Sequence, residues 1–464
     1  MRHSALQHRA FSRPIEALLL LGVALAAFLG FTMAHVTSQL AHESRPLSGL
    51  GIAWAPPLAL TLGLFALHFT FVWRRIDAEQ VILPILGLLL SIGLLLLWRL
   101  LPPWATWQQI TRGLIPGFVA IVLLVSFPTW VERLRHDLPV TTSIAGLVLL
   151  VATAFAGVRD EAGARLALKI GPLPAIQTSE LVKLSLIVFL SWYIESEGAA
   201  AHGRVWSLGP LRLPPVRYLI PGTLFVSLAT LALVKMSDLG AILILGALFV
   251  ALFYAGFERR IFLTMAAIGL ALSFAVAIVL ASYWQPPAGL QQRLAAFRDP
   301  WSEEPLLIDG QPTGVTIAQG PGYQIQQAIY AIVDGGITGT GIGAGTPENV
   351  PLAHSDMIFA AVAEELGAMG ALAVLACFGI MLLRILRIAM LLPAGQVLER
   401  LLLVGIAAHL FSQVFVMVGG TVNLLPLTGV TIPFLSQGGV ALTVNLLEIG
   451  LVLAIAQRLR VSVT

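Results

Sequence analysis

The chain has 464 residues, of which 58% are hydrophobic and only 11% are charged, and its mean hydropathy is +0.90. Soluble domains carry about a quarter charged residues, so this composition excludes a soluble chain of two or three domains. The net charge of +3 comes without a basic stripe interleaved with aromatic residues, so nothing indicates a nucleic-acid partner. Cys377 is the only cysteine, which excludes a disulfide framework and a cysteine metal site.

Apolar runs of about 20 residues, the length that a helix needs to cross a bilayer, recur along the whole chain. We therefore predict an all-α polytopic membrane protein, surrounded by membrane lipids, with about twelve transmembrane helices. The predicted spans are 15–35, 51–73, 80–101, 113–130, 139–157, 177–197, 216–235, 239–256, 261–282, 357–385, 397–420 and 438–457. The first run has a basic lead, like a signal peptide, but its length and the lack of a clear cleavage site favour a retained anchor helix.

Lysine and arginine in the short loops predict the orientation. With the N-terminus in the cytoplasm, the cytoplasmic segments hold nearly twice as many basic residues as the outer ones, so we expect both termini in the cytoplasm. Two long loops, 158–176 and 283–356, then lie outside. The second contains acidic, aromatic and apolar residues together, which predicts a packed functional loop with short helices around 322–334.

Several ionisable residues lie in or beside the apolar spans, namely Glu180, Lys183, Lys235, Asp238, Glu364, Glu365 and Glu448. A charge in hydrocarbon is costly unless it is paired or hydrated, so each is either a functional candidate or part of a structural ion pair. Glu180 and Lys183 are three residues apart and share one helical face. A lysine near the outer end of a span can face a water-filled cavity and bind a phosphate group.

Four stretches of sequence point to a family. They are Gly163-Ala164-Arg165 through Lys169-Ile170-Gly171-Pro172 to Gln177-Thr178-Ser179-Glu180 and Lys183; Ser237-Asp238-Leu239-Gly240; Gly322-Tyr323-Gln324 through His354-Ser355-Asp356 to Glu364-Glu365-Leu366-Gly367; and Leu425-Pro426-Leu427-Thr428-Gly429 through Ser436-Gln437-Gly438-Gly439. Together they resemble the SEDS family of RodA, FtsW and SpoVE. The resemblance covers roughly residues 80–457, so 80–464 is similar to the ten-helix core of that family and 1–79 looks like an addition of two helices.

The resemblance implies a peptidoglycan glycosyltransferase of the bacterial cytoplasmic membrane that polymerises lipid II at the outer face with a class B penicillin-binding protein as partner. In this inverting reaction, a carboxylate in the large outer loop takes a proton from the acceptor hydroxyl and undecaprenyl pyrophosphate leaves. A positioned base typically contributes about 10²–10⁴-fold. The pyrophosphate needs no proton, but its developing charge needs cations. Lys183, Arg165 and Arg293 are the candidates, and a divalent cation, Mg²⁺ or Mn²⁺, could assist.

Around the expected catalytic base, the sequence departs from the pattern of the family. The family's acid is an aspartate before a proline, shortly before Gly-Tyr-Gln, whereas here Glu304 precedes Pro305 and an insertion, roughly 306–320, follows. Glu304 is the predicted base, with Glu303, Asp299 and Asp309 as alternatives. Because glutamate is one methylene longer, the carboxylate shifts by about 1 Å, which can be costly for catalysis.

Further residues of the four stretches are expected to bind substrate or to shape its cavity. Asp238 and Glu180 are expected to set the electrostatics of the cavity. The remaining substrate-binding candidates are Ser436, Gly438, Gly439, His354 and Asp356. The glycines at 339, 341 and 343 lack the strand-turn-helix context of a dinucleotide site, so we expect them to form tight turns.

Two other functions remain open at this stage. A transporter of a lipid-linked precursor would also use an apolar cavity with buried charges, although the sequence shows no repeated halves. A non-catalytic scaffold that binds the penicillin-binding protein would tolerate the change to Glu304 and the insertion after it.

Overall fold

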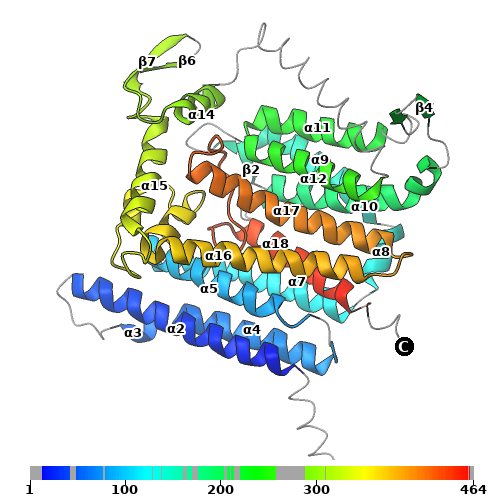
Figure 1. The fold of residues 1–464 in the computed structure, drawn as a ribbon, viewed down its shortest axis with the longest axis horizontal. Helices are drawn as coiled ribbons and strands as arrows, with labels where there is room; N and C mark the ends of the chain where they lie inside the picture. Colours follow the sequence, from blue (N-terminus) through cyan, green and yellow to red (C-terminus); the bar gives the residue numbers. More distant parts are fainter. Residues whose placement is uncertain are drawn as a thin grey trace, which may run out of the picture. The chain divides into compact units, whose positions relative to one another are not determined.

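The computed structural model describes residues 13–41, 49–76, 79–127, 129–136, 138–159, 165–169, 176–202, 206–208, 211–213, 220–257, 288–308, 310–457 and 459. Helices dominate this part of the chain (Figure 1). Within it, nine helices are long and apolar enough to cross a membrane. The prediction of an all-α polytopic membrane protein is confirmed, while the count of twelve spans stays a prediction.

Every predicted span falls on a helix except 261–282, which lies outside the described residues. The helices are α2 (Pro14–Ala41), α3 and α4 (Leu50–Ala53 and Ala55–Trp73), α5 (Ile82–Leu100), α7 (Ile115–Ser126), α9 (Leu138–Ala156), α10 (Thr178–His202), α11 (Ile220–Met236), α12 (Leu239–Gly256), α16 (Ile358–Leu391), α17 (Val397–Thr421) and α18 (Gly439–Ala456). Helix α10 is not among these nine helices, because it carries four charged residues, namely Glu180, Lys183, Glu195 and Glu197.

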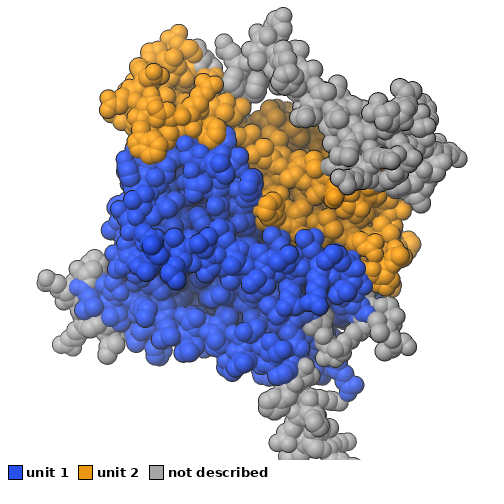
Figure 2. All heavy atoms as spheres, viewed as in Figure 1, with its two compact units in different colours: residues 1–130, 323–391, 413–464 blue, residues 131–322, 392–412 orange. Residues whose placement is uncertain are grey.

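The chain divides into two compact units (Figure 2). Unit 1 contains residues 1–130, 323–391 and 413–464, and unit 2 contains residues 131–322 and 392–412. In unit 1, α18 packs against α7, and α5 packs against both α2 and α16. Unit 1 also holds α6 (Pro103–Gln109), the π-helical turn η1 (Ile110–Leu114), most of α15 (Pro321–Gly335) and the 3-10 turn η3 (Pro347–Asn349). Helix α15 confirms the short helix expected around 322–334.

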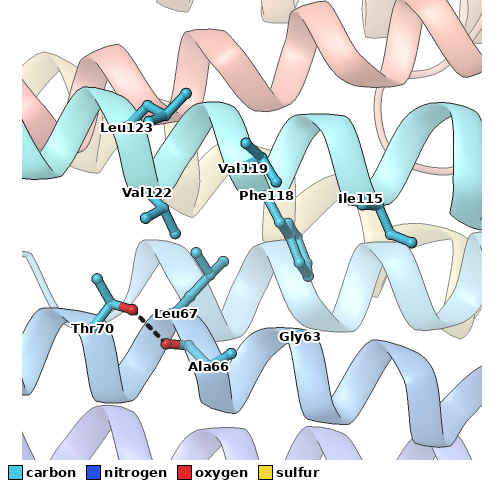
Figure 3. Close-up of a pocket in the computed structure, with 9 residues that line it drawn as sticks. All are labelled: Gly63, Ala66, Leu67, Thr70, Ile115, Phe118, Val119, Val122 and Leu123. Carbon is cyan, nitrogen blue, oxygen red and sulfur yellow. Dashed lines mark hydrogen bonds between the residues drawn. The ribbon is translucent and has the colours of Figure 1, made fainter.

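A cavity of about 330 Å³ opens between α4 and α7 in unit 1 (Figure 3). Apolar side chains such as Leu67, Phe118 and Val119 line it. Its one hydroxyl, that of Thr70, donates to the backbone oxygen of Ala66 at 2.8 Å within its own helix. No group in this cavity can transfer a proton or bind a phosphate, so the chemistry must lie elsewhere.

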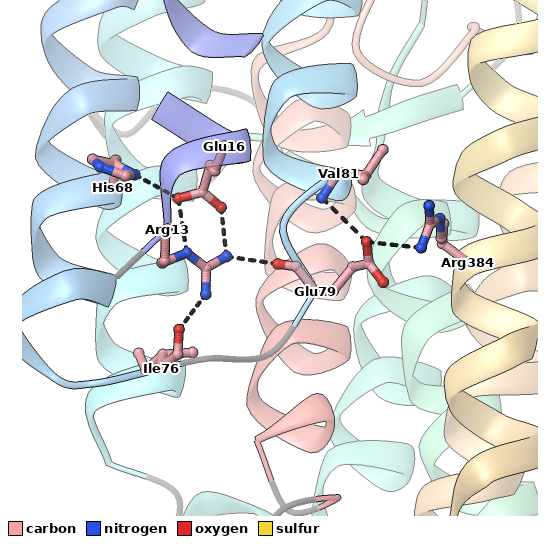
Figure 4. Close-up of polar contacts among 7 residues, drawn as sticks. All are labelled: Arg13, Glu16, His68, Ile76, Glu79, Val81 and Arg384. Atoms are coloured by element: carbon pink, nitrogen blue, oxygen red, sulfur yellow. Dashed lines mark hydrogen bonds and ion pairs between the residues drawn. The ribbon is translucent and has the colours of Figure 1, made fainter. Parts of the chain in front are cut away.

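A buried ion network joins α2 and α4 to the rest of unit 1 (Figure 4). Arg13 donates to both carboxylate oxygens of Glu16 and, at 2.6 Å, to the backbone oxygen of Glu79. The Nδ1 atom of His68 on α4 lies 2.7 Å from Oε1 of Glu16. The Glu79 carboxylate in turn lies 3.6 Å from Arg384 on α16. The ion pairs of Glu16 therefore join α2 to α4, and a hydrogen bond from Arg13 to the Glu79 backbone connects both helices to the segment before α5.

The long helix α16 is interrupted at Gly367, whose φ and ψ of 68° and −176° no helix contains. The loop that follows α15 fills the break with backbone hydrogen bonds. Thr340 N–H donates to the oxygen of Glu364 at 2.9 Å, and Gly341 N–H donates to that of Glu365 at 3.1 Å. The φ angles of Gly339, Gly341 and Gly343 are 84°, 101° and 78°, which confirms the tight turns predicted there.

In unit 2, α10 packs against α9 and α12, and α11 packs against the same two helices. Unit 2 also contains α8 (Trp130–His136), apart from its first residue, and α14 (Ala288–Arg298). Three small antiparallel sheets lie in segments that we expected to be loops. They consist of β1 (Val158–Arg159), β2 (Arg165–Leu168) and β3 (Ile176–Gln177); β4 (Trp206–Leu208) and β5 (Leu211–Leu213); and β6 (Pro305–Ile308) and β7 (Gln311–Thr316). The insertion after Glu304 is therefore a β-hairpin and a turn that leads into α15.

Candidate functional site

The predicted cation site of unit 2 begins with an ion pair in the first turns of α10. The Nζ atom of Lys183 donates to Oε1 of Glu180 at 2.7 Å, and both side chains are almost fully buried. Their spacing of three residues places them on one helical face, as the sequence predicts. The sequence allowed Lys183 to face a water-filled cavity. In this structure the carboxylate one turn earlier covers the ammonium group.

Asp238 joins this pair from the N-terminus of α12. Its Oδ1 atom accepts a hydrogen bond from the backbone N–H of Ala241 at 2.9 Å, which caps the helix. Burial raises the pKa of Asp238 above its usual range, whereas the helix cap and the positive charges of Lys183 and Arg293 oppose this rise. The negative charge of Glu180 acts in the same direction as burial.

Four of the predicted site residues therefore lie within electrostatic range of one another in unit 2, namely Glu180, Lys183, Asp238 and Arg293. Two cations and two carboxylates are gathered there from α10, α12 and α14. An anionic ligand that reached this cluster would compete with the carboxylates for the cations. The backbone of Arg165 lies on β2, opposite Arg159 of β1, and its side chain lies outside the described part of the structure.

The candidate bases lie between α14 and β6 in unit 2. Backbone hydrogen bonds fix this segment, because Ala318 N–H donates to Ser302 at 2.9 Å and Ile317 N–H donates to Glu304 at 3.1 Å. The carboxylates of Glu303 and Glu304 are exposed and make no hydrogen bond or ion pair within the described residues. Asp299 is also exposed, and its Oδ1 atom accepts from Trp301 N–H at 3.0 Å. Asp309 lies outside the described residues.

Substrate-binding candidates from two distant stretches meet in unit 1. Ser436 Oγ donates to the backbone oxygen of Ser355 at 2.6 Å and accepts from Ile432 N–H at 3.0 Å. The backbone N–H of Gln437 donates to the oxygen of His354 at 2.9 Å. The loop between α17 and α18, which also contains Gly438 and Gly439, is therefore joined to the segment before α16.

Backbone strain marks the same place. Leu352 and Phe434 are not glycines, yet their φ angles are 57° and 67°. Such conformations are unfavourable for bulky residues and cluster at functional sites. A Cβ at Gly429, whose φ is 74°, would lie 3.8 Å from Oδ2 of Asp356, so the Asp356 carboxylate lies beside that turn. Burial lowers the pKa of His354, which favours the neutral imidazole.

Sequence reasoning missed Arg99, which holds the loop after α15 in unit 1. Its Nη2 atom donates to the oxygen of Gly345 at 2.9 Å and lies 3.4 Å from Glu348, while Nε lies 3.6 Å from buried Glu365. Glu364 accepts from the N–H of Thr346 at 2.6 Å. These contacts favour a structural role for the two glutamates. Two carboxylates in an apolar run were a signal that a cation should be sought nearby.

No three His, Cys, Asp or Glu side chains in the described part of the chain are grouped so that they could hold a metal ion. The predicted Mg²⁺ or Mn²⁺ therefore has no ligand set among these residues.

Comparison with known proteins identifies the family. Residues 74–461 match the family described as cell cycle proteins, which comprises FtsW, RodA and SpoVE. The chain belongs to this SEDS family. The matched region begins directly after α4, so α2, α3 and α4 precede it. With nine apolar helices in its described part, this member of the family is a multi-pass membrane protein.

Relatives from several bacteria match most of the chain. It is 30% identical over 394 residues to the peptidoglycan glycosyltransferase RodA of Mycobacterium tuberculosis, covering 82% of this chain and 78% of the relative. It is 29% identical over 398 residues to the stage V sporulation protein E of Bacillus subtilis, covering 83% and 98%. It is 33% identical over 361 residues to the FtsW protein of Thiomicrospira cyclica, covering 76% and 82%.

Two solved structures share the fold. A chain from a peptidoglycan synthase complex, described in terms of polymerization and crosslinking, superposes with a TM-score of 0.65 at 24% identity, covering 82% of this chain and 98% of that one. The rod shape determining protein RodA of Thermus thermophilus superposes with a TM-score of 0.56 at 23% identity, covering 82% and 98%. At these identities the likeness concerns the fold alone.

Proposed function

We propose that this SEDS protein is a peptidoglycan glycosyltransferase that polymerises lipid II at the outer face of the bacterial cytoplasmic membrane. The observation that carries the proposal is the match to relatives of that activity, at 30% identity over 82% of the chain. The cluster of Lys183, Arg293, Glu180 and Asp238 supports it, because a pyrophosphate leaving group needs buried cations. The basic residues of the short loops support an orientation with both termini in the cytoplasm.

The proposed base is Glu304. Its carboxylate takes the proton of the acceptor's sugar hydroxyl as the oxygen of that hydroxyl attacks the anomeric carbon of the donor. The bond from this carbon to the pyrophosphate oxygen breaks, and its electron pair leaves with undecaprenyl pyrophosphate. One carboxylate is enough, because the leaving group departs unprotonated. The exposed position of Glu304, on a backbone fixed by Ile317, suits a base that must reach a bulky substrate.

The proposed role of Lys183, with Arg293 and Arg165, is to bind the pyrophosphate. Because Glu180 pairs with Lys183 at 2.7 Å, the phosphate must displace that carboxylate from the ammonium group. Asp238 and Glu180 balance the charge of the cations when no substrate is bound. In this way the cluster tolerates burial before the reaction and favours the additional negative charge that develops on the pyrophosphate as the bond breaks.

Other parts of the chain have proposed roles of their own. Five residues are proposed to contact lipid II, namely Ser436, Gly438, Gly439, His354 and Asp356. They lie on two joined segments whose backbone strain indicates function. Residues 1–79 are an addition to the core 80–464. A class B penicillin-binding protein is the proposed partner, in line with the synthase complex whose chain shares this fold.

The test is polymerisation of labelled lipid II by the purified protein, with and without the penicillin-binding partner. Wild type is compared with Glu304→Gln and with the matched control Glu303→Gln, since both carboxylates are exposed neighbours. Glycan chains from wild type and Glu303→Gln but not from Glu304→Gln would support the enzyme and its base. Chains from all three would move the base to Asp299 or Asp309. No chains from wild type, with partner binding demonstrated, would favour the scaffold.

A further inference from the structure

The loop between α17 and α18 depends on one side chain that the proposed mechanism does not use. Gln109, the last residue of α6, is buried, with 3% of its surface exposed. Its Nε2 atom donates to the backbone oxygen of Ser436 at 3.1 Å, and its Oε1 atom accepts from the backbone N–H of Gly438 at 3.0 Å. One amide thus binds the loop on both sides of Gln437.

The loop has little regular structure that could supply hydrogen-bond partners to the Ser436 oxygen and the Gly438 N–H. Phe434 has a φ of 67°, and Gly438, with φ of 167° and ψ of 89°, precedes α18 without a side-chain cap. A buried backbone N–H or C=O group without a hydrogen-bond partner is unfavourable. The amide of Gln109 therefore selects, among the conformations open to residues 436–438, the one that is observed.

The helices around Gln109 hold the loop within hydrogen-bond distance of its side chain. A Cβ at Gly93 of α5 would meet the backbone oxygen of Leu435 at 2.6 Å, and a Cβ at Gly113 would meet that of Gly439 at 3.2 Å. The loop therefore lies directly on two helix backbones. The hydroxyl of Thr443 on α18 donates to the oxygens of Arg112 and Gly113, both at 3.2 Å, which holds the π-helical turn that follows Gln109. A π-turn is rare and often marks a functional position.

Few side chains can satisfy both the Ser436 oxygen and the Gly438 N–H from position 109. Leucine has a similar size but no donor or acceptor, and asparagine is one methylene shorter. An ionised glutamate can accept from Gly438 but cannot donate to Ser436. A protonated glutamate has one donor and one acceptor on the same frame, as the amide has.

We propose that Gln109 is a positioning residue of the glycosyltransferase reaction, which holds Ser436 and Gly438 in the conformation that binds lipid II. This inference rests on the proposed function. Gln109 acts through the loop and touches no reacting atom. Because a misplacement of about 1 Å can lower a rate 10²-fold, loss of the clamp reduces polymerisation even when the fold is retained.

The experiment compares wild type, Gln109→Leu and Gln108→Leu in steady-state polymerisation of lipid II, per amount of folded monodisperse protein. The neighbour Gln108 is the control, because its side-chain amide has no hydrogen bond in the described structure. We expect Gln109→Leu to lose about 10–100-fold in kcat/KM and Gln108→Leu to stay within twofold. Gln109→Glu should regain rate relative to wild type as the pH is lowered and its carboxyl group takes up a proton.

Hydrogen exchange of the backbone at 432–439 supplies a readout that needs no activity. We expect faster exchange in Gln109→Leu and no change in Gln108→Leu. Equal rates for the two leucine variants, or a rate loss that only follows the loss of folded protein, would overturn the positioning role. If wild type forms no polymer, the proposed function fails and the catalytic role of Gln109 fails with it. Unchanged exchange in Gln109→Leu would refute the clamp itself.

Discussion

Replacing Glu16 by alanine should strongly weaken the attachment of the two N-terminal helices. Glu16 is fully buried and accepts two hydrogen bonds from Arg13, while its Oε1 atom lies 2.7 Å from Nδ1 of His68. Without it, the guanidinium of Arg13, only 1% exposed, loses the carboxylate that accepts two of its hydrogen bonds. Removing one member of a buried ion pair costs about 3–5 kcal/mol. A loss of that size lowers a melting temperature by roughly 5 °C or more.

The assay is thermal unfolding of the purified protein in detergent, followed by tryptophan fluorescence. Glu303→Ala is the control, because it removes an exposed acid without contacts in the described structure. The double variant Arg13→Met with Glu16→Leu should recover most of the stability, since apolar replacement of a whole buried pair is often neutral. A melting temperature of Glu16→Ala within 2 °C of the control, or a double variant as unstable as the single one, would refute this reasoning.

Three further outcomes are expected. Lys183→Gln should reduce polymerisation at least tenfold. Lys235→Gln is the control and should have little effect on the rate, because the Lys235 ammonium lies 3.4 Å from the centroid of the Phe155 ring. Equal losses in the two variants would contradict the role of Lys183 as the cation. Gly93→Ala should lose about 1–3 kcal/mol, because its new methyl group meets loop backbone, whereas Gly22→Ala, with nothing within 4 Å, should not; melting temperatures decide. Burial lowers the folded pKa of His354, so its contribution to stability is complete above the unfolded value of about 6.5 and declines as the pH falls below it. Wild type should therefore melt at a lower temperature at pH 5 than at pH 7.5, and His354→Gln should show a smaller decline; an unchanged decline would contradict the assignment.

The membrane helices could be predicted because hydrocarbon allows few alternatives. Every described span was visible as an apolar run, and charges inside such runs indicated Glu180, Lys183 and Asp238, which the structure brings together. The burial of Lys183 could not be predicted, because spacing alone does not say whether a carboxylate or water covers an ammonium group.

Uncharged and short features were harder to detect. Gln109 gave no signal, because a single amide in a short loop carries no charge and no periodicity. The hairpin formed by β6 and β7 has strands too short for alternation to be informative. Arg13 was interpreted only as a topological charge, although Glu16, the carboxylate that it pairs with, is only three residues further on. The choice among the loop acids stays a prediction, since their exposed carboxylates have no neighbours in the described structure that distinguish a base.

The clamp of Gln109 has a consequence for how the protein is made. The hydrogen bond to Ser436 joins residues 327 positions apart, so it cannot form until the ribosome has added more than three hundred residues after Gln109. A membrane protein is synthesised from its N-terminus, and contacts of such long range form late. The amide of Gln109 must therefore wait, without its partners, while most of the helices enter the bilayer. A nascent chain that stops before Ser436 lacks both partners of Gln109, so the site that we propose for lipid II cannot be complete while only the helices up to α17 have been made.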